Sequence, residues 1–515
     1  MWCSPDKLCT FENLCYHPDS RQFLFVLSEQ SILQGLSRSE FNQLELASVR
    51  GHNRMFMNLI FVSAVNEVLI GATFKNENLF VIHTFKRDNI MHAIHDDLLP
   101  IFSTYQRLCG GDIEPCINKY RLTFVNDPNP GPYANLYQIF SKRDVLLLSE
   151  YNQDSPICFK EVRIGLVRSS LWFDYGFTGV QGRIANPTIT GKDLRLFRDF
   201  ILSAGNLVPV KSSNGGCVVF VKRTASRRIV NEDYVKETII NSMKLLGQKF
   251  VCLVEVDLLK DRSELILSAV YKSDMLVGMH GAGMALAAFL PTGAAVLEMF
   301  PFAIDPVNVS PIMAMCDLRD VGLHYVYWRN LNRSSSIPPA TTDPLGGGIQ
   351  HLPPQRQAEI LHLEKVDAVP CCHDPAYLYY MFQDTVVGND FDRTVSRAFK
   401  MLAEFYIDDF VFDSYETVKR LWLMPGPVFN IACRCHDDKS IDISWADPLN
   451  SAEFDSLDYE VSAVVGDDVV YSGTVQDTQL KLHTTDCHNL KLWICAKDTG
   501  GKLKSKDVFY ECKLV

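Results

Sequence analysis

Three polar side chains, two of them able to transfer protons, lie close together near residue 90 of this 515-residue chain. Asn89, His92 and Asp96 are spaced three and four residues apart, so a helix would place all three on one face. Imidazole and carboxylate groups are common general acids and bases, so this face is a candidate acid–base cluster. The alternative is a solvated helix face capped by Asp88, and the spacing alone favours that alternative.

A second candidate site lies in the segment from Ser273 to Pro301. An apolar run meets a turn containing His280, Gly281 and Gly283, and a second apolar run ends at Glu298. Unbroken apolar runs are typical of parallel strands buried on both faces, and such sheets bind ligands at the carboxyl ends of their strands. The small residues would let a helix N-terminus approach a phosphate, and Glu298 could accept hydrogen bonds from a ribose. The segment lacks the full dinucleotide fingerprint, so an ordinary tight turn remains the alternative.

Basic residues follow another predicted strand, Val218-Val-Phe-Val221. The next seven residues hold four cations, and Arg223 and Arg227 lie just past the strand end. Guanidinium groups bind phosphate oxygens in pairs, so this loop is a candidate diphosphate clamp, with a solvated loop as the alternative. Asn231 is predicted to cap the helix that follows, over residues 233–246.

Two acidic pairs could hold a metal ion. Glu255-Val-Asp257 follows a predicted strand over residues 250–254, which makes it the best candidate. The D-x-D sequence at Asp390-Phe-Asp392 lies instead in a predicted helical connector.

The composition places these motifs in an ordinary globular protein: 47% of the residues are hydrophobic and 22% are charged. A net charge of −11 argues against a nucleic-acid partner. Sixteen cysteines and the glycosylation sequons at Asn308 and Asn332 favour a lumenal or extracellular protein with several disulfides. The sequence holds neither a long apolar run nor a signal-peptide pattern, so we expect the targeting segment to lie outside this chain.

The alternation of predicted strands and helices divides the chain into four parts. We predict a first α/β domain at 1–210, a second, doubly wound α/β domain at 211–385, a helical connector at 386–424 and an all-β domain at 425–515. Short alternating strands in the last part, with Trp445 and Tyr459 as core residues, favour a fibronectin type III sandwich.

In this order, the motifs resemble the family-61 glycosyltransferases. The likeness rests on Asn89-x-x-His92-x-x-x-Asp96, Arg223-x-x-x-Arg227-x-x-x-Asn231, the turn Met279-His280-Gly281-Ala282 and Glu298. One branch of that family is resembled more closely, through DNIMHAIHDDLLPIF, DYGFTGVQG, YVYWRN, the Cys371-Cys372 pair, FQDT at Phe382 to Thr385 and the terminal sandwich. The resemblance covers nearly the whole chain.

The resemblance implies a glycosyltransferase B-type fold, with two Rossmann-like lobes followed by the fibronectin module. It implies inverting transfer of N-acetylglucosamine from UDP-GlcNAc, in β1,4 linkage, to O-linked mannose on a protein such as α-dystroglycan. The setting would be the lumen of the endoplasmic reticulum, and the protein would be a single-pass type II membrane protein whose anchor is missing from this chain. A homodimer is compatible with the sequence but not required by it.

Roles for the candidate residues follow from that chemistry. The acceptor hydroxyl needs a base, and either Asp96 or His92 could serve, with Asn89 on the same face. The resemblance implies that Arg223 and Arg227 hold the diphosphate, and that no metal is required. The four residues from His280 to Gly283, which include Ala282, would add N–H donors, and Glu298 would bind the ribose.

Two other functions fit the motifs less well. A lumenal transferase that places N-acetylglucosamine directly on Ser or Thr of extracellular domains would share the donor site, but the fibronectin-like tail argues against it. A catalytically inactive, sugar-binding relative would be expected to lose the arginines or the Asn89 face, and both are present.

Overall fold

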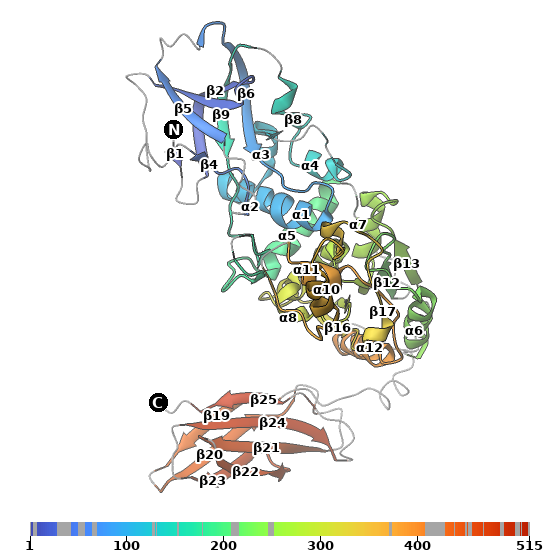
Figure 1. Ribbon diagram of the computed structural model, residues 1–515. Coiled ribbons are helices and arrows are strands. Elements are labelled where there is room, and N and C mark those ends of the chain that lie inside the picture. The colour runs from blue at the N-terminus through green and yellow to red at the C-terminus, as the bar shows by residue number, and fades with distance from the viewer. Residues whose placement is uncertain are drawn as a thin grey trace. The chain divides into compact units, whose positions relative to one another are not determined.

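The structure, a computed structural model, falls into two compact units, Met1–Asp408 and Asp409–Val515 (Figure 1). It describes residues 2–3, 8–27, 43–49, 57–63, 69–125, 129, 131–151, 154–177, 179–205, 207, 216–245, 252–369, 373–406, 428–436, 438–448, 451, 456–466, 468–484, 489–499, 505 and 507–512. Each unit is described by itself below. The predicted domain boundaries inside the first unit remain predictions.

The first unit begins with a nine-stranded mixed sheet in the order β4-β5-β3-β2-β9-β6-β7-β8, with β1 on β2. Its strands are β1 (Trp2–Cys3), β2 (Cys9–His17), β3 (Gln22–Leu27), β4 (Gln43–Leu44), β5 (Met57–Ser63), β6 (Thr73–Ile82), β7 (Arg121–Phe124), β8 (Leu146–Leu147) and β9 (Ile157–Ile164). Strands β9, β6, β7 and β8 are parallel to one another, whereas β2 is antiparallel to β3 and β9. A disulfide between Cys15 and Cys158 joins β2 to β9.

Helices follow the parallel strands of this sheet. They are α1 (Ile90–His92), the π-helix η4 (Ala93–Leu98), α2 (Leu99–Leu108), α3 (Glu114–Lys119), α4 (Ala134–Gln138), η5 (Leu148–Glu150) and α5 (Gly191–Ala204). The short strands β10 (Phe173–Asp174) and β11 (Gly182–Arg183) form a hairpin before α5. Thr190 caps α5 through reciprocal hydrogen bonds with Asp193.

The second sheet of the first unit is entirely parallel, in the order β13-β12-β14-β15-β16. Its strands are β12 (Cys217–Val221), β13 (Cys252–Val256), β14 (Met275–Met279), β15 (Ala295–Phe300) and β16 (His324–Arg329), with α6 (Glu232–Leu245), α7 (Ser263–Tyr271) and the 3-10 helix η6 (Ala282–Phe289) between the first four. Every residue of β14 and β15 is buried, as the unbroken apolar runs predicted. This is a doubly wound order, in which ligands bind beyond the carboxyl ends of the strands.

Short elements complete the first unit around this sheet. They are α8 (Pro306–Val309), α9 (Pro311–Cys316), η7 (Arg333–Ser335), β17 (Ser336–Ile337), η8 (Pro344–Gly346), α10 (Pro354–Leu361), α11 (Pro375–Met381), β18 (Asp384–Thr385) and α12 (Phe391–Tyr406). Helix α12 packs on β15, β16 and α6, so its apolar face belongs to the core of the second sheet. The Cys371-Cys372 pair lies outside the described residues.

One hydrophobic core runs through both parts of the first unit. It includes Phe80 and Leu98 beside the first sheet, Val219 and Leu276 in the second, and Met284 on η6. Helix η6 contacts both α1 and α5, and Figure 1 shows α1, α2 and α5 between the two sheets. The predicted α/β class is therefore confirmed, whereas the description as two Rossmann-like lobes remains a prediction, because the first sheet is mixed.

The second unit is the predicted all-β sandwich. One sheet has the order β19-β20-β23 and the other β22-β21-β24-β25. The strands are β19 (Phe429–Cys435), β20 (Ser440–Ala446), β21 (Leu457–Val465), β22 (Asp468–Val475), β23 (Gln479–His483), β24 (Leu490–Asp498) and β25 (Val508–Glu511). Trp445 and Tyr459 are buried together between the sheets, as predicted, with ring centroids 5.5 Å apart. A disulfide joins Cys433 to Cys512.

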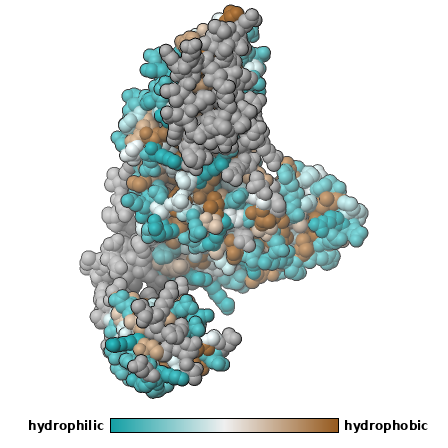
Figure 2. Space-filling view, turned by 90° about the vertical axis from the view of Figure 1, so that its left-hand side faces the viewer, coloured by the Kyte–Doolittle hydropathy of each residue, from teal (hydrophilic) through white to brown (hydrophobic). Residues whose placement is uncertain are grey.

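The surface of the described residues has the mixed character of a globular protein. Figure 2 shows a face on which hydrophilic residues are interspersed with smaller groups of hydrophobic ones. None of the helices among the described residues combines the length and the hydrophobicity that crossing a membrane requires.

Candidate active site

The predicted acid–base cluster of Asn89, His92 and Asp96 lies beyond the carboxyl end of β6, where the chain continues into α1 and η4. The Asn89 side chain caps α1 by accepting hydrogen bonds from the backbone N–H groups of Met91 (3.0 Å) and His92 (3.5 Å). The prediction that Asp88 is the cap was therefore wrong, because the helix begins one residue later than the spacing suggested. Asn89 orients the first turn through its backbone contacts.

Asp96 is the centre of this cluster. One carboxylate oxygen lies 2.6 Å from Nδ1 of His92 and the other lies 2.6 Å from Nδ1 of His95. Burial alone would raise the pKa of Asp96, but the charges and hydrogen bonds of the two imidazoles outweigh it and hold the pKa below its ordinary value. Asp96 is therefore ionised and serves as the charge partner of His92.

The π-helical turn makes this arrangement possible. It buries His95 and Asp96 together, and the Ser48 hydroxyl donates to the backbone carbonyl of Asp96 at 2.6 Å. Widened helical turns of this kind occur often at functional sites. The backbone N–H of Trp172 donates to Nε2 of His95 at 3.4 Å, which leaves Nδ1 of His95 as the protonated nitrogen facing Asp96.

The neighbouring carboxyl group has the opposite character. Asp97 is buried and accepts a hydrogen bond from the Tyr137 hydroxyl at 2.6 Å. Burial raises the pKa of Asp97 well above its ordinary value, with a smaller contribution from the charge of Asp96. The pKa values of two adjacent aspartates are thus shifted in opposite directions, and strongly shifted pKa values are frequent at catalytic centres.

His280 and Glu298 form a second imidazole–carboxylate pair, beyond β14 and at the end of β15. Nδ1 of His280 lies 2.8 Å from one oxygen of Glu298, and the other oxygen accepts from the hydroxyls of Ser310 (2.5 Å) and Tyr325 (2.6 Å). Glu298 has no exposed surface. The structure therefore shows Glu298 as a support for His280, whereas its predicted contact with a ribose remains untested.

Arg223 and Arg227 converge on the turn after β14. A Cβ built on Gly281 would lie 2.6 Å from a terminal nitrogen of Arg223 and 3.0 Å from one of Arg227, so both guanidinium groups rest against the bare glycine. Gly281 also has a φ of +146°, which favours glycine. Arg227 donates to the His280 carbonyl at 3.1 Å.

These two guanidinium groups are close like charges without a carboxylate in salt-bridge range among the described residues. Burial lowers the pKa of Arg223, and the nearby charge of Arg227 lowers it further. Burial also lowers the pKa of Arg227, to about 10. Two cations held side by side in a partly buried place form a natural binding site for an anion such as a diphosphate.

A strap formed by residues 384–387 fixes the arginine loop. Asp384 accepts from the backbone and the guanidinium of Arg228 at 2.6–2.8 Å. The Asn231 side chain exchanges two hydrogen bonds with the backbone of Val387, at 2.8 and 2.9 Å. Asn231 directly precedes α6, and its backbone carbonyl accepts from the Val235 N–H at 3.4 Å, so it lies at the predicted N-cap position while its side chain holds residues 384–387.

The two halves of the site meet where α1 contacts η6. His92 ends α1, and Ala282 and Gly283 begin η6 directly after the arginine-bound turn. A Cβ on Gly283 would lie 2.7 Å from the Val221 side chain, so this glycine lets η6 pack closely on β12. The predicted site residues thus lie on α1 and η4 in one half, on η6 and β15 in the other, and on the loops beside these elements.

Glu255 and Asp257, the acidic residues predicted as the best candidate metal site, interact with other protein groups. Glu255 forms ion pairs with Lys222 (2.8 Å) and Lys236. Asp257 accepts from the backbone of Leu259 at 3.0 Å and so holds its own turn. Within the described part of the chain, three or more acidic, histidine or cysteine side chains are nowhere grouped as metal ligands.

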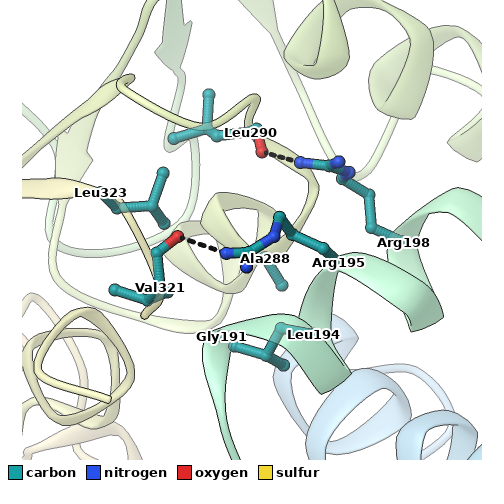
Figure 3. Close-up of a pocket in the computed structure, with 8 residues that line it drawn as sticks. All are labelled: Gly191, Leu194, Arg195, Arg198, Ala288, Leu290, Val321 and Leu323. Carbon is teal, nitrogen blue, oxygen red and sulfur yellow. Dashed lines mark hydrogen bonds between the residues drawn. The ribbon is translucent and has the colours of Figure 1, made fainter. Parts of the chain in front are cut away.

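A pocket at the far end of η6 has a structural role. It is lined by Gly191, Leu194, Arg195, Arg198, Ala288, Leu290, Val321 and Leu323 (Figure 3). Arg198 donates to the Leu290 carbonyl at 2.8 Å and Arg195 to the Val321 carbonyl at 3.4 Å. These bonds tie α5 to the second sheet, so we interpret the pocket as part of the joint between the two halves of the unit.

Sequence reasoning missed several residues of the site. His95 stands three residues from His92, so the same helical spacing that selected Asp96 could have identified it. Ser310 and Tyr325 bind Glu298 from distant parts of the chain, and no local spacing signals them. Tyr325 does belong to the YVYWRN segment.

Comparison with known proteins places the chain among glycosyltransferase relatives. No protein-family model matches it. It is 32% identical to a Tetraodon nigroviridis protein over 392 residues, 74% of this chain and 65% of that protein. It is 31% identical to a Xenopus tropicalis protein over 389 residues, 74% of this chain and 66% of that protein. A Canis lupus familiaris protein is 29% identical over 460 residues, 86% of this chain and 75% of that protein.

All three relatives are, by name, glycosyltransferases. Each is called protein O-linked-mannose β-1,4-N-acetylglucosaminyltransferase 2, so the resemblance inferred from the motifs is confirmed as homology to proteins of that name. The chain spans 65% of the length of the Tetraodon protein.

Solved structures match only a small part of the chain. Domains d3–d4 of the rat CD45 extracellular region are 12% identical and cover 18% of the chain with a TM-score of 0.16. The FN3tt mutant is also 12% identical, with a TM-score of 0.15. These likenesses are too slight to identify a fold.

Proposed function

We propose that this chain is an inverting glycosyltransferase. It moves N-acetylglucosamine from UDP-GlcNAc, in β1,4 linkage, to an O-linked mannose on a protein such as α-dystroglycan. The observation that supports this most strongly is the placement of an imidazole–carboxylate pair on α1 next to η6, the helix that begins at the arginine-bound turn. The shared name of the relatives supports the same choice of donor sugar and acceptor.

His92 is the base in this proposal. Asp96 is a poor base because its pKa is lowered, whereas a neutral imidazole accepts a proton readily near neutral pH. Nδ1 of His92 faces Asp96, so Nε2 takes the proton from the mannose 4-hydroxyl. The mannose oxygen then bonds to the anomeric carbon of N-acetylglucosamine as the bond from that carbon to UDP breaks, and the configuration inverts.

Arg223 and Arg227 stabilise the negative charge that this step creates on the diphosphate. As the sugar–phosphate bond breaks, negative charge grows on the departing diphosphate, and fixed cations already in place stabilise it. The backbone of the turn from His280 to Gly283 lies against the same guanidinium groups. Because two cations are available there, we propose that the reaction needs no metal ion.

The remaining assignments extend the same proposal. The two sheets of the first unit would be the acceptor and donor lobes of a B-type glycosyltransferase, and the sandwich of the second unit a fibronectin type III module. Three disulfides among the described residues favour the oxidising lumen of the endoplasmic reticulum.

The test is to incubate the full chain with UDP-GlcNAc and a synthetic O-mannosyl peptide, with and without EDTA. We expect release of UDP and a product heavier by one N-acetylhexosamine in both samples, with the β1,4 linkage assigned by NMR. Transfer to an unmannosylated Ser or Thr peptide instead would favour the other transferase function. UDP binding without any transfer would contradict the proposal, and loss of transfer with EDTA would contradict metal independence alone.

A further inference from the structure

Two phenylalanines stand beside the proposed base. Phe85 follows the carboxyl end of β6 and is 39% exposed. Its ring lies 5.1 Å from the ring of His92, at 81°, and 5.4 Å from the ring of Phe177, at 75°. Phe85 therefore packs on the imidazole that would take the acceptor proton, and Phe177, from a separate loop, packs on Phe85.

Gly176, which directly precedes Phe177, lies in a close backbone turn. Gly176 has a φ of +81°, and a Cβ there would lie 2.6 Å from the backbone nitrogen of Gln181. The Gly176 N–H donates to Asp174 at 2.8 Å, and the Gln181 N–H donates to the Val369 carbonyl at 3.3 Å. Phe177 is thus presented by this turn.

Neighbouring aromatic residues of the same segment behave differently. Trp172 and Phe173 are buried in the core, and the ring of Trp172 packs 4.3 Å from that of His95. Tyr175 packs 4.9 Å from His92 and places its hydroxyl 3.1 Å from Nδ1 of His95. The inner rings therefore support the imidazole–carboxylate cluster, while Phe85 and Phe177 extend the aromatic surface outward from it.

We propose that Phe85 and Phe177 form the surface on which the acceptor sugar binds. A pyranose ring has faces rich in C–H groups and a rim of hydroxyls, so stacking on an aromatic side chain buries the apolar face and leaves the hydroxyls accessible. A hexose stacked here presents a rim hydroxyl to His92. This inference rests on the proposed function, since it names the acceptor sugar as the ligand.

The experiment compares Phe85→Ala and Phe177→Ala with the unchanged full chain. Steady-state kinetics give the KM for an O-mannosyl peptide, calorimetry gives the affinity for UDP, and saturation-transfer NMR reports contact with the mannose protons without requiring turnover. We expect each variant to raise the KM for the peptide by about tenfold and to reduce saturation of the mannose protons, with UDP affinity within about twofold. Phe85→Trp, which keeps an aromatic face, should recover most of the loss.

The control is Phe74→Ala, which removes a 72% exposed phenylalanine at the opposite end of the same strand and should change neither quantity. If the unchanged chain transfers sugar normally and both alanine variants keep its KM, the surface is disproved while the proposed function stands. If no transfer occurs but mannose still binds through Phe85, the proposed function fails and the surface stands. Absence of mannose contact in the unchanged chain overturns the inference.

Discussion

The candidate site contains two imidazole–carboxylate pairs, one in each half of the first unit. In both, Nδ1 of a histidine faces a buried carboxylate, at 2.6 Å for His92 and Asp96 and at 2.8 Å for His280 and Glu298. The pairs differ in what holds the second carboxylate oxygen. Asp96 faces another imidazole, whereas Glu298 accepts from the hydroxyls of Ser310 and Tyr325.

We propose that this difference separates a proton-transfer centre, the His92 pair, from a structural support, the His280 pair. The His92 pair lies among aromatic rings, with its charge partner fixed by His95. His280 is stacked on Phe300 with ring centroids 4.9 Å apart at 22°, and its backbone carbonyl binds Arg227. We therefore expect the first pair to govern turnover and the second to govern the shape of the diphosphate site.

The largest effect should come from Asp96→Asn. An amide keeps the size of the side chain but removes the charge that stabilises protonated His92, and it can reverse the hydrogen bond that fixes the imidazole tautomer. We expect kcat to fall by about a thousandfold while UDP affinity stays within about twofold. Single-turnover transfer to the O-mannosyl peptide, combined with UDP calorimetry, measures both.

The adjacent Asp97→Asn variant is the matched control. Because burial holds the pKa of Asp97 well above its ordinary value, the uncharged form is favoured there, and an amide should perturb the site less than it does at Asp96. We expect kcat within about threefold of the unchanged chain. Equal losses in the two variants would contradict the separate roles assigned to these carboxyl groups.

The second prediction concerns the other half of the site. Arg223→Ala should weaken UDP binding by about thirtyfold, because a cation matched to the diphosphate is lost. Arg262→Ala, which removes a 76% exposed arginine in the same half, should leave UDP affinity unchanged. Calorimetric titration of UDP into both variants checks this, and retained affinity in Arg223→Ala would exclude it from the diphosphate site.

Much of this second half could be predicted from the sequence. The apolar runs of β14 and β15 have the composition of buried parallel strands, and Gly281 and the arginines follow strand ends, where a doubly wound sheet gathers its ligand-binding groups. Local pattern and tertiary position agree there. Residues 218–221 and 275–277 accordingly lie in the strands that the sequence predicted.

The first half was harder to predict, for physical reasons. Strand β2 pairs with β9, where Cys15 lies opposite Cys158, 143 residues further along the chain, and no local period reports such pairing. The helix begins one residue later than assumed, with Asn89 as its cap, and a π-helical turn at Ala93–Leu98 replaces the regular α-helix where His95 meets Asp96. The supports of Glu298 come from α9 and β16, so only the folded chain reveals them.

The third prediction tests whether Glu298 supports His280. Glu298→Gln keeps the volume but weakens the hold on His280 and removes an acceptor of two hydroxyls, so His280 and the turn against the arginines should lose their fixed position. Such supporting contacts commonly contribute ten- to a hundredfold, and we expect a loss of about tenfold in kcat/KM for UDP-GlcNAc. Tyr325→Phe, which removes one hydrogen bond, should lose less. A kcat effect as large as that of Asp96→Asn would contradict the contrast between the pairs.

The smallest effect is on stability. The contributions of Asp96 and Asp97 to the free energy of unfolding should change with pH in opposite directions. The pKa of Asp96 is below its ordinary value of 3.8, so its stabilising contribution is present above that value and is lost as the pH falls through the folded-state pKa. The pKa of Asp97 is raised, so its contribution is present below 3.8 and is lost as the pH rises toward the folded-state pKa. Adjacent carboxyl groups should thus respond to pH in opposite directions.

Urea unfolding of the full chain and of both asparagine variants measures this between about pH 3 and pH 6. As the pH falls, the free energy of unfolding lost in Asp96→Asn should shrink, whereas the loss in Asp97→Asn should grow, each by about 1 kcal/mol or more over the range. Subtracting each variant from the unchanged chain cancels the titration of all other groups. Parallel slopes would mean that the two aspartates share one protonation state, and His92 would then lose the ionised partner that sets its pair apart from that of His280.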